Sequence, residues 1–502
     1  MEPPNVVCLV LDCLRADAIT ASDAPNIHAL AERNLSFDAC VTPANWSLPA
    51  HASLFTGEWP HDHGYFRRDQ SLGRMPLIET LNDEGYQTVG TSANVFASSS
   101  YGFDHGFDHF YETRRPLNSK GLNPFARVRQ LSGTEEPGPA EYARTFLDSL
   151  AHDHPVASVD NFGRSVALSL DRRFGLRRYL PFVDDDRYGF LTRAADRSTA
   201  YLAERMKRVA DGPVPLFAFA NYMNTHYPYQ PPERHFRAVT DGERTLSELR
   251  NMDPDISHSR VFRDTAFADR IDEEDVTLVR AAYRAEVRSV DEQVGRLLEA
   301  LEAAGIREET IVVVTADHGE CLGEGDLRNE RAMGHFDGLS EHLWTVPLIV
   351  ANPRIDPDTV ETHTSLKSLF DLLVGDLAAF LEAGGRTWDD HFDDDPVFFE
   401  LPANPTNEAS LRSYSHYPDW FVERIARTHT VVGFDGPYVV VVDSNGQASG
   451  FRDGDPVDVS SIPDALYEEC EDAVGAFEPV TGAAESDLSD DVTEQLADLG
   501  YV

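Results

Sequence analysis

The run NVVCLVL at residues 5–11, followed at once by Asp12, is the stretch that decides the fold. It is short, apolar throughout and rich in β-branched residues, which is typical of a strand buried on both faces. A second run of this kind, TIVVVTA at residues 310–316, ends in the pair Asp317-His318. Strands buried on both faces belong to parallel sheets that helices cover, so the two runs predict an α/β domain.

Helical and strand-like segments alternate elsewhere in the chain. Residues 277–304 have the apolar spacing of a helix and end before Gly305. Residues 77–93 indicate a helix followed by a strand, and PLFAFANYMNTH at 215–226 indicates a strand that runs into a loop. The alternation predicts a large, mostly parallel sheet flanked by helices.

Changes in composition predict the domain organisation. We expect a catalytic domain at residues 1–410, with an insertion at about 105–200 where Pro, Gly and charged residues mix without periodicity. Residues 429–451 alternate short β runs with Asp-Gly and Asn-Gly turns, the pattern of antiparallel hairpins. Residues 411–502 are therefore expected to form a small C-terminal domain with an antiparallel sheet and an acidic tail, which ends in the helical pattern TEQLADLG at 493–500.

The charge of the chain is extreme. There are 86 acidic and 43 basic residues, a formal net charge of −43, and lysine occurs only at Lys120, Lys207 and Lys367. Such a surface repels itself unless salt screens it, which predicts a halophilic protein of an archaeal, salt-rich cytoplasm. A moderately acidic mesophilic protein is the alternative. Either way, the absence of a basic patch argues against nucleic acid or an anionic membrane as a partner.

The cysteines and the apolar runs indicate which disulfides, metal sites and membrane spans can be expected. The five cysteines are odd in number and show no CxxC spacing, so we expect neither a disulfide framework nor a structural zinc site. MEPPN leads directly into the first strand without a signal-peptide pattern, and no apolar run is long enough to span a membrane. The expected location is cytoplasmic.

Side chains capable of chemistry follow several of the expected strands. Asp12, Asn94, His226 and the pair Asp317-His318 each come just after an apolar run. Function in open α/β sheets lies at the carboxyl ends of the strands, so these groups are expected to converge. Two carboxylates and an imidazole suit one divalent cation, which makes Asp12, Asp317 and His318 candidate metal ligands.

Ser47 is the candidate nucleophile. It opens SLPAHASLFTG at residues 47–57, where a hydroxyl at an exposed helix N-terminus would lie near backbone amides that stabilise an anion. A serine in this position is also an ordinary helix cap. A nearby metal ion favours the catalytic interpretation, because it lowers the pKa of an oxygen nucleophile.

Taken together, these segments resemble the sulfatase family of the alkaline phosphatase superfamily. The opening strand with Asp12, the SLPAHASLFTG segment, NTHYPYQPP, ADHGECLGEG and MGHFDGLSEHLWTVPLIV occur in the family's order. The resemblance implies an alkaline-phosphatase-like fold with one divalent metal ion. It also implies roles for individual residues: Asp12, Ser47, Asp317 and His318 at the metal, Ser47 as nucleophile, His51 as a further catalytic residue in the nucleophile motif, His226 and His335 as catalytic and substrate-binding residues at the ester oxyanion or leaving group, and Asn94 in the substrate pocket.

The chain departs from the family pattern at three positions. Cys13 replaces a second Asp after the first strand, His51 replaces an Arg, and Ser47 replaces the cysteine that is converted to formylglycine. We expect Ser47 to act as serine. Among Mn, Zn, Ca and Mg, the imidazole of His318 and the loss of a hard oxygen ligand favour Mn or Zn.

The predicted activity is metal-dependent hydrolysis of a small-molecule or glycan sulfate ester. A phosphomonoester, phosphodiester or phosphonate ester hydrolase, or a phosphotransferase, fits the same residues, because serine also serves phosphate esters. A non-catalytic anion-binding homologue is the alternative of another class, and Cys13 and His51 are the features that favour it. The sequence leaves the oligomeric state open.

Overall fold

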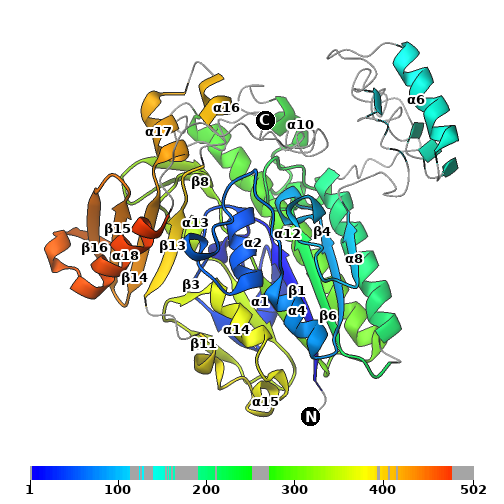
Figure 1. Cartoon of the computed structure of the whole chain (residues 1–502), viewed down its shortest axis with the longest axis horizontal. Coiled ribbons are helices and arrows are strands. Elements are labelled where there is room, and N and C mark those ends of the chain that lie inside the picture. Colours follow the sequence, from blue (N-terminus) through cyan, green and yellow to red (C-terminus); the bar gives the residue numbers. More distant parts are fainter. Residues whose placement is uncertain are drawn as a thin grey trace.

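The first predicted strand, β1 (Asn5–Leu11), lies at the centre of an eight-stranded sheet in the computed structural model (Figure 1). All of its residues are buried, and it pairs in parallel with β6 (Leu216–Tyr222) and with β7 (Thr310–Thr315). The structure describes residues 3–113, 139–152, 190–209, 212–251, 271–392, 396–404, 408–413 and 417–477, with a few single positions between 122 and 163.

Five further strands extend the sheet on both sides. Beyond β6, β4 (Gln87–Ser92) and β5 (His109–Glu112) continue it in parallel. Beyond β7, β10 (Leu348–Ala351) is antiparallel to both of its neighbours, β7 and β2 (Leu35–Phe37), and β11 (Asp358–Val360) forms the edge in parallel with β2. The order is β11-β2-β10-β7-β1-β6-β4-β5, so the predicted mostly parallel sheet is confirmed.

Helices flank the sheet, as the alternation of segments predicted (Figure 1). The longest is α12 (Glu273–Ala304), which packs against α8 (Phe190–Val209), α9 (Glu233–Val239) and α1 (Pro25–Ala31). It begins where the Asp272 side chain accepts a hydrogen bond from the Asp275 N–H, at 2.8 Å, and it ends at Gly305, which has a φ of 71°. A second group consists of α2 (Ser47–Thr56), α4 (Pro76–Asp83) and α14 (Leu369–Leu373).

A separate antiparallel sheet forms the C-terminal part. Its strands are β13 (Val397–Leu401), β14 (Thr430–Asp435), β15 (Tyr438–Asp443), β16 (Ala448–Arg452) and β17 (Asp455–Val457), in that order. Helix α18 (Asp464–Ala476) packs on β14 and β15. The predicted hairpins are confirmed, with Gly436 and Gly446 at positive φ in the turns.

The C-terminal sheet starts earlier in the chain than residue 411, where we expected the domain boundary. The reason is that the apolar strand β13 pairs along its whole length with β14. The C-terminal sheet also packs against helix α13 (Glu341–Trp344), since the Trp344 ring lies 5.8 Å from Phe399 and 5.4 Å from Phe434. The division into two domains therefore stays a prediction.

The predicted insertion at about 105–200 is only partly described. At its two ends, β5 belongs to the main sheet and α8 packs on β6 and α12. Helix α6 (Pro139–Ala151) lies between them in sequence, and most of the other positions of this segment, like TEQLADLG, fall outside the described residues. Among the helices that are described, none combines the length and apolar character that crossing a membrane requires.

Candidate active site

The polar groups at the strand ends converge, as the sequence predicted. Asp12 follows β1, Asn94 follows β4, His226 follows β6 and Asp317 follows β7, and these four strands are parallel neighbours. Their carboxyl ends therefore lie along one edge of the sheet. The Thr225 hydroxyl donates a hydrogen bond to the Asp12 carbonyl at 2.5 Å, which ties the loop after β6 to the end of β1.

Ser47 is the first residue of α2, and its side chain reaches the carboxylate group at the end of β1. Its Oγ lies 3.4 Å from Asp12 Oδ2 and 3.4 Å from His318 Nε2. We expected an exposed helix start, but Ser47 is only 2% exposed because these groups and Asn94 surround it. The capping position belongs to Trp46, so the Ser47 hydroxyl is not engaged as a helix cap.

Asn94 orients the Ser47 hydroxyl. Its Oδ1 accepts a hydrogen bond from the Phe96 N–H at 2.7 Å, at the start of a short 3₁₀ helix. The orientation of the amide is thereby fixed, and Nδ2 donates to Ser47 Oγ at 2.8 Å and to Asp12 Oδ2. The structure thus brings this predicted pocket residue into direct contact with the candidate nucleophile.

Asp12, Asp317 and His318 form a group suited to a metal ion. Their ligand atoms lie within 4.8 Å of one another and all three residues are buried. Burial, and then the charge of Asp317, raise the pKa of Asp12. Asp317 Oδ2 is buried without a hydrogen bond to any residue that the structure describes. Two adjacent buried carboxylates are costly unless a cation compensates them, so this donor set fits a divalent ion.

Hydrogen bonds with backbone groups orient the side chains of Asp317 and His318. Asp317 Oδ1 accepts hydrogen bonds from the N–H groups of Cys13, at 3.3 Å, and His318, at 3.0 Å, which leaves Oδ2 for another partner. His318 Nδ1 lies 2.9 Å from the Gly319 carbonyl oxygen, so this nitrogen carries the hydrogen. Nε2 of His318 then presents its lone pair to Ser47 and Asp317. Burial alone would raise the pKa of Asp317, but His318 and His51 lower it.

His51 lies one helical turn after Ser47 and contacts the supporting parts of the site. Its Nδ1 donates to the Ser47 carbonyl at 2.8 Å and is 3.6 Å from Asp317 Oδ2, and its Nε2 is 3.3 Å from Asn221 Nδ2. Burial lowers the pKa of His51. These contacts support the start of α2 and the position of Asp317, and a direct catalytic role for His51 stays a prediction.

His226 and His335 lie side by side next to the metal group. Their ring centroids are 5.4 Å apart, and the His335 ring is 4.6 Å from that of His318. Burial, followed by the nearby His335, lowers the pKa of His226 to about 3, which favours a neutral imidazole. Its Nδ1 lies against the Tyr227 carbonyl oxygen, so in the neutral ring the hydrogen is on Nδ1 and Nε2 is an acceptor.

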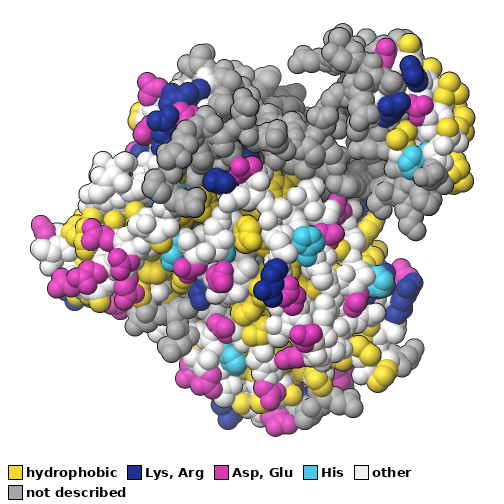
Figure 2. All heavy atoms as spheres, in the orientation of Figure 1, with side chains coloured by type: hydrophobic (Ala, Val, Ile, Leu, Met, Phe, Trp, Pro, Cys, Tyr) yellow, Lys and Arg dark blue, Asp and Glu magenta, His cyan; other side chains and the backbone are white. Residues whose placement is uncertain are grey.

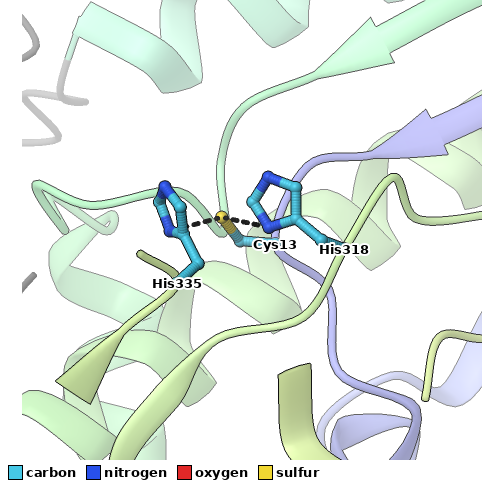
Figure 3. Close-up of side chains that lie close together, drawn as sticks. All are labelled: Cys13, His318 and His335. Atoms are coloured by element: carbon cyan, nitrogen blue, oxygen red, sulfur yellow. Dashed lines mark hydrogen bonds between the residues drawn. The ribbon is translucent and has the colours of Figure 1, made fainter. Parts of the chain in front are cut away.

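The sequence analysis missed the contribution of two side chains, Cys13 and Glu320. Figure 3 shows the Cys13 thiol between the rings of His318 and His335, with Sγ 3.7 and 3.8 Å from their Nδ1 atoms. Glu320 Oε1 lies 3.2 Å from His335 Nδ1. Burial raises the pKa of the Cys13 thiol. Cys13 follows Asp12 directly and Glu320 lies two residues after His318, so their positions in the sequence could have indicated that they belong to the site. The sequence suggested to us only that Cys13 replaces a metal ligand.

The fold and this constellation define a class: α/β proteins that gather carboxylates, imidazoles and a hydroxyl around a metal-binding group at the carboxyl edge of the sheet. The sulfatase family model matches residues 4–377, so the chain belongs to the sulfatase family.

Relatives in the family are distant in sequence. The ulvan-active sulfatase of Formosa agariphila is 22% identical over 74% of this chain and 61% of its own length. The choline-sulfatase of Rhizobium meliloti is 25% identical over 77% of this chain and 70% of its own. Among solved structures, the phosphonate monoester hydrolase of Agrobacterium radiobacter has a TM-score of 0.59 at 18% identity and covers 94% of this chain and 95% of its own. This structural likeness concerns the fold.

Proposed function

We propose that this protein hydrolyses sulfate esters and that Ser47 is its nucleophile. The observation that carries the proposal is the position of Ser47 Oγ, 3.4 Å from both Asp12 Oδ2 and His318 Nε2 and within hydrogen-bonding distance of Asn94. A hydroxyl next to a metal-binding group, with hydrogen-bond donors on the other side, has the parts that ester hydrolysis at sulfur or phosphorus requires.

The roles of the residues follow from their contacts. Asp12, Asp317 and His318 would hold the divalent ion, which when bound supplies positive charge that lowers the pKa of a hydroxyl and offsets charge on the ester oxygens. Asn94 holds Ser47 Oγ in position for in-line attack. Ser47 would release its hydroxyl proton to solvent before it attacks. The bond from Ser47 Oγ to sulfur then forms while the bond to the alcohol oxygen breaks, and that oxygen would take up a proton from His335, which lies beside the neutral His226. Water then cleaves the serine ester and releases sulfate.

The identity of the metal ion is a further proposal. Imidazole is a ligand for borderline ions such as zinc and manganese, whereas calcium prefers six to eight oxygen ligands. His318 is one of the three ligand residues, and the Cys13 thiol lies 3.3 Å from Asp12 Oδ1. We therefore expect Mn²⁺ or Zn²⁺ to support activity better than Ca²⁺ or Mg²⁺.

A phosphate or phosphonate ester is the second candidate substrate. The observation in its favour is that Ser47 stands where the family has the cysteine that becomes formylglycine, because an unmodified serine suits transfer of a phosphoryl group. The structural likeness to a phosphonate monoester hydrolase agrees with this alternative. A non-catalytic anion-binding protein would keep the metal group and show no turnover.

One comparison of substrates tests the proposal. We would assay nitrophenyl sulfate, nitrophenyl phosphate, a phosphodiester and a phosphonate monoester with each divalent ion in concentrated KCl. Faster cleavage of the sulfate supports a sulfatase, and faster cleavage of a phosphorus ester identifies the second candidate. No turnover of any ester would refute the proposal. Mass spectrometry of the Ser47 peptide, looking for the loss of two hydrogens, tests its conversion to formylglycine.

We also propose that the protein works in concentrated salt, as in a haloarchaeal cytoplasm. The net charge of −43 supports this proposal. Figure 2 shows acidic side chains spread over one face, with basic side chains in a few small groups. Repulsion within such a surface weakens as the Debye length falls from ~10 Å at 0.1 M salt to ~3 Å at 1 M.

A further inference from the structure

The chain makes a tight turn immediately after β1, between Leu11 and Leu14. The Leu14 N–H donates a hydrogen bond to the Leu11 carbonyl oxygen at 3.0 Å, which closes the turn. Cys13, the third residue of the turn, has a φ of 60°. Turns with a positive φ at this position normally contain glycine there, because a side chain meets the backbone. The turn is therefore strained at Cys13, directly after the candidate metal ligand Asp12.

The turn acts on the candidate metal group through the peptide bond between Asp12 and Cys13. The N–H of this peptide donates to Asp317 Oδ1 at 3.3 Å, and its carbonyl oxygen accepts a hydrogen bond from the Thr225 hydroxyl at 2.5 Å. Since φ of Cys13 is the rotation about its N–Cα bond, a relaxed turn with a negative φ requires this peptide to rotate. The rotation would take the N–H away from Asp317, and that carboxylate would lose one of the two bonds that orient it.

Tyr283 of α12 holds the second half of the turn. Its hydroxyl donates a hydrogen bond to the Cys13 carbonyl oxygen at 2.8 Å and accepts one from the Arg15 N–H at 2.9 Å. The phenol therefore uses its donor and an acceptor position on the same short stretch of backbone. Its side chain is buried, and an edge contact with the Tyr229 ring, at 5.6 Å between centroids, helps to hold it in place. Without the hydroxyl, two buried backbone groups would lose this partner.

We propose that Tyr283 and Thr225 are positioning residues for the metal ion, because together they hold the strained turn that orients Asp317. Strained backbone persists only where surrounding contacts fix it, and these two hydroxyls supply such contacts on both sides of Cys13. Groups that orient the ligands of a metal ion typically change its affinity by about 10- to 100-fold. The inference rests on the proposed function, since it concerns the divalent ion of that same site.

A positioning role for Tyr283 differs from a merely structural one in its dependence on Cys13. Glycine adopts a positive φ without strain, so Cys13→Gly should keep the turn in place with or without the Tyr283 hydroxyl. Tyr283→Phe is therefore expected to raise the Kd for the metal ion about 10- to 100-fold in the wild-type chain, but less than about threefold in the Cys13→Gly chain. If Tyr283 contributes only to general stability, the two ratios should be equal.

Metal binding is the readout, and it requires no turnover. We would titrate the metal-free wild type, the two single variants and the double variant with Mn²⁺ and with Zn²⁺ by calorimetry in concentrated KCl, using a competing chelator to set the free ion concentration. Equal ratios in the two backgrounds, or an unchanged Kd in Tyr283→Phe, would overturn the proposal. A wild type that binds neither ion would also overturn it, because there would be no ion to position.

Tyr222→Phe is the matched control. The Tyr222 side chain is also buried, and its hydroxyl lies 2.9 Å from the Thr199 hydroxyl of α8, so this substitution removes a buried hydrogen bond of a similar kind. That bond joins Tyr222 to a helix and not to the turn after β1. The Kd of this variant is expected to stay within about twofold of the wild type. A rise as large as that in Tyr283→Phe would contradict the proposal.

Thr225 provides a second test that does not depend on the folding of Tyr283→Phe. Thr225→Val keeps the shape of the side chain without the hydroxyl, whereas Thr225→Ser keeps the hydroxyl. The first is expected to raise the Kd about 10-fold or more, and the second to leave it within about threefold of the wild type. Equal Kd values in the two variants would refute the role of Thr225.

The same titrations separate failure of this inference from failure of the proposed function. Coupling between Tyr283 and Cys13 in a protein that cleaves no ester would support the inference and refute the proposed function. Ester cleavage by a protein without this coupling would support the proposed function and refute the inference.

Discussion

Glu286 lies inside α12 with a side chain that is only 1% exposed, and it faces the loop after β6 that carries His226. Its Oε1 accepts a hydrogen bond from the Gln230 N–H at 2.8 Å. Burial raises the pKa of Glu286 from 4.5 to about 8, since the hydrogen bonds it receives only partly offset the loss of solvation. At neutral pH the folded protein therefore keeps a proton that the unfolded chain releases.

This difference makes stability depend on pH in a defined direction. Between the unfolded pKa of 4.5 and the folded pKa of about 8, the folded state binds more protons, so the free energy of unfolding falls as pH rises. Each pH unit in this window corresponds to about 1.4 kcal/mol, which gives a total loss of up to about 5 kcal/mol. Glu286→Gln keeps the shape of the neutral side chain and removes this loss.

Denaturant unfolding in concentrated KCl, followed from about pH 5 to about pH 9, measures the effect. The two proteins should be similar in stability at the acidic end, and Glu286→Gln should be the more stable by several kcal/mol at the alkaline end. Glu299→Gln, at an exposed position of the same helix, serves as the control and should show no such divergence. A constant difference between Glu286→Gln and wild type across the range would refute the reasoning.

Four other predictions concern the site and the surface. Ser47→Ala should lower kcat by about 10³-fold or more with unchanged metal content, and retained turnover would remove Ser47 from the mechanism. His318→Ala should lose bound metal by elemental analysis, because it removes one of three candidate ligands; equal stoichiometry would contradict its assignment. Asn94→Ala should lower kcat about 10- to 100-fold through loss of the hydrogen bond to Ser47, and an unchanged kcat would argue against that role. The melting temperature should rise steeply with KCl concentration, and a flat profile would refute the halophilic interpretation.

The sequence predicted the parts of this molecule that depend on local pattern. The apolar runs at 5–11 and 310–316 are short and β-branched, which favours buried strands, and parallel strands bring their carboxyl ends to one edge. The convergence of Asp12 and Asp317 followed from that rule alone. The hairpins of the C-terminal sheet followed from their turn residues, since Asp-Gly and Asn-Gly supply the positive φ that tight turns need.

Features that depend on long-range contacts could not be predicted in this way. Strand β13 was not assigned to the C-terminal sheet, because its partner β14 follows it only after about thirty residues, a separation that local pattern does not bridge. The burial of Ser47 depends on Asn94 and His318, which come from other strand ends. Likewise, the proposed role of Tyr283 becomes apparent only when the contacts of its hydroxyl with the turn at Cys13 are known.

The candidate site and the pocket that includes His335 draw on different parts of the chain. Asp12, Asn94, His226 and Asp317 follow parallel strands within residues 4–377, the part that the family model matches, and rigid strands hold such groups in precise geometry. Ser47 begins α2 and His335 follows β9, and both lie within the same matched part. The pocket draws on both parts of the chain. Trp46 and His335 in its lining belong to the matched region, whereas Leu401, Arg424 and Thr430 come from β13, from the helix at Asp419–Arg427 and from β14, which follow that region. Under the proposed function, substitutions of Asp12, Asp317 or His318 should affect all esters alike, because these residues would hold the ion that every ester requires.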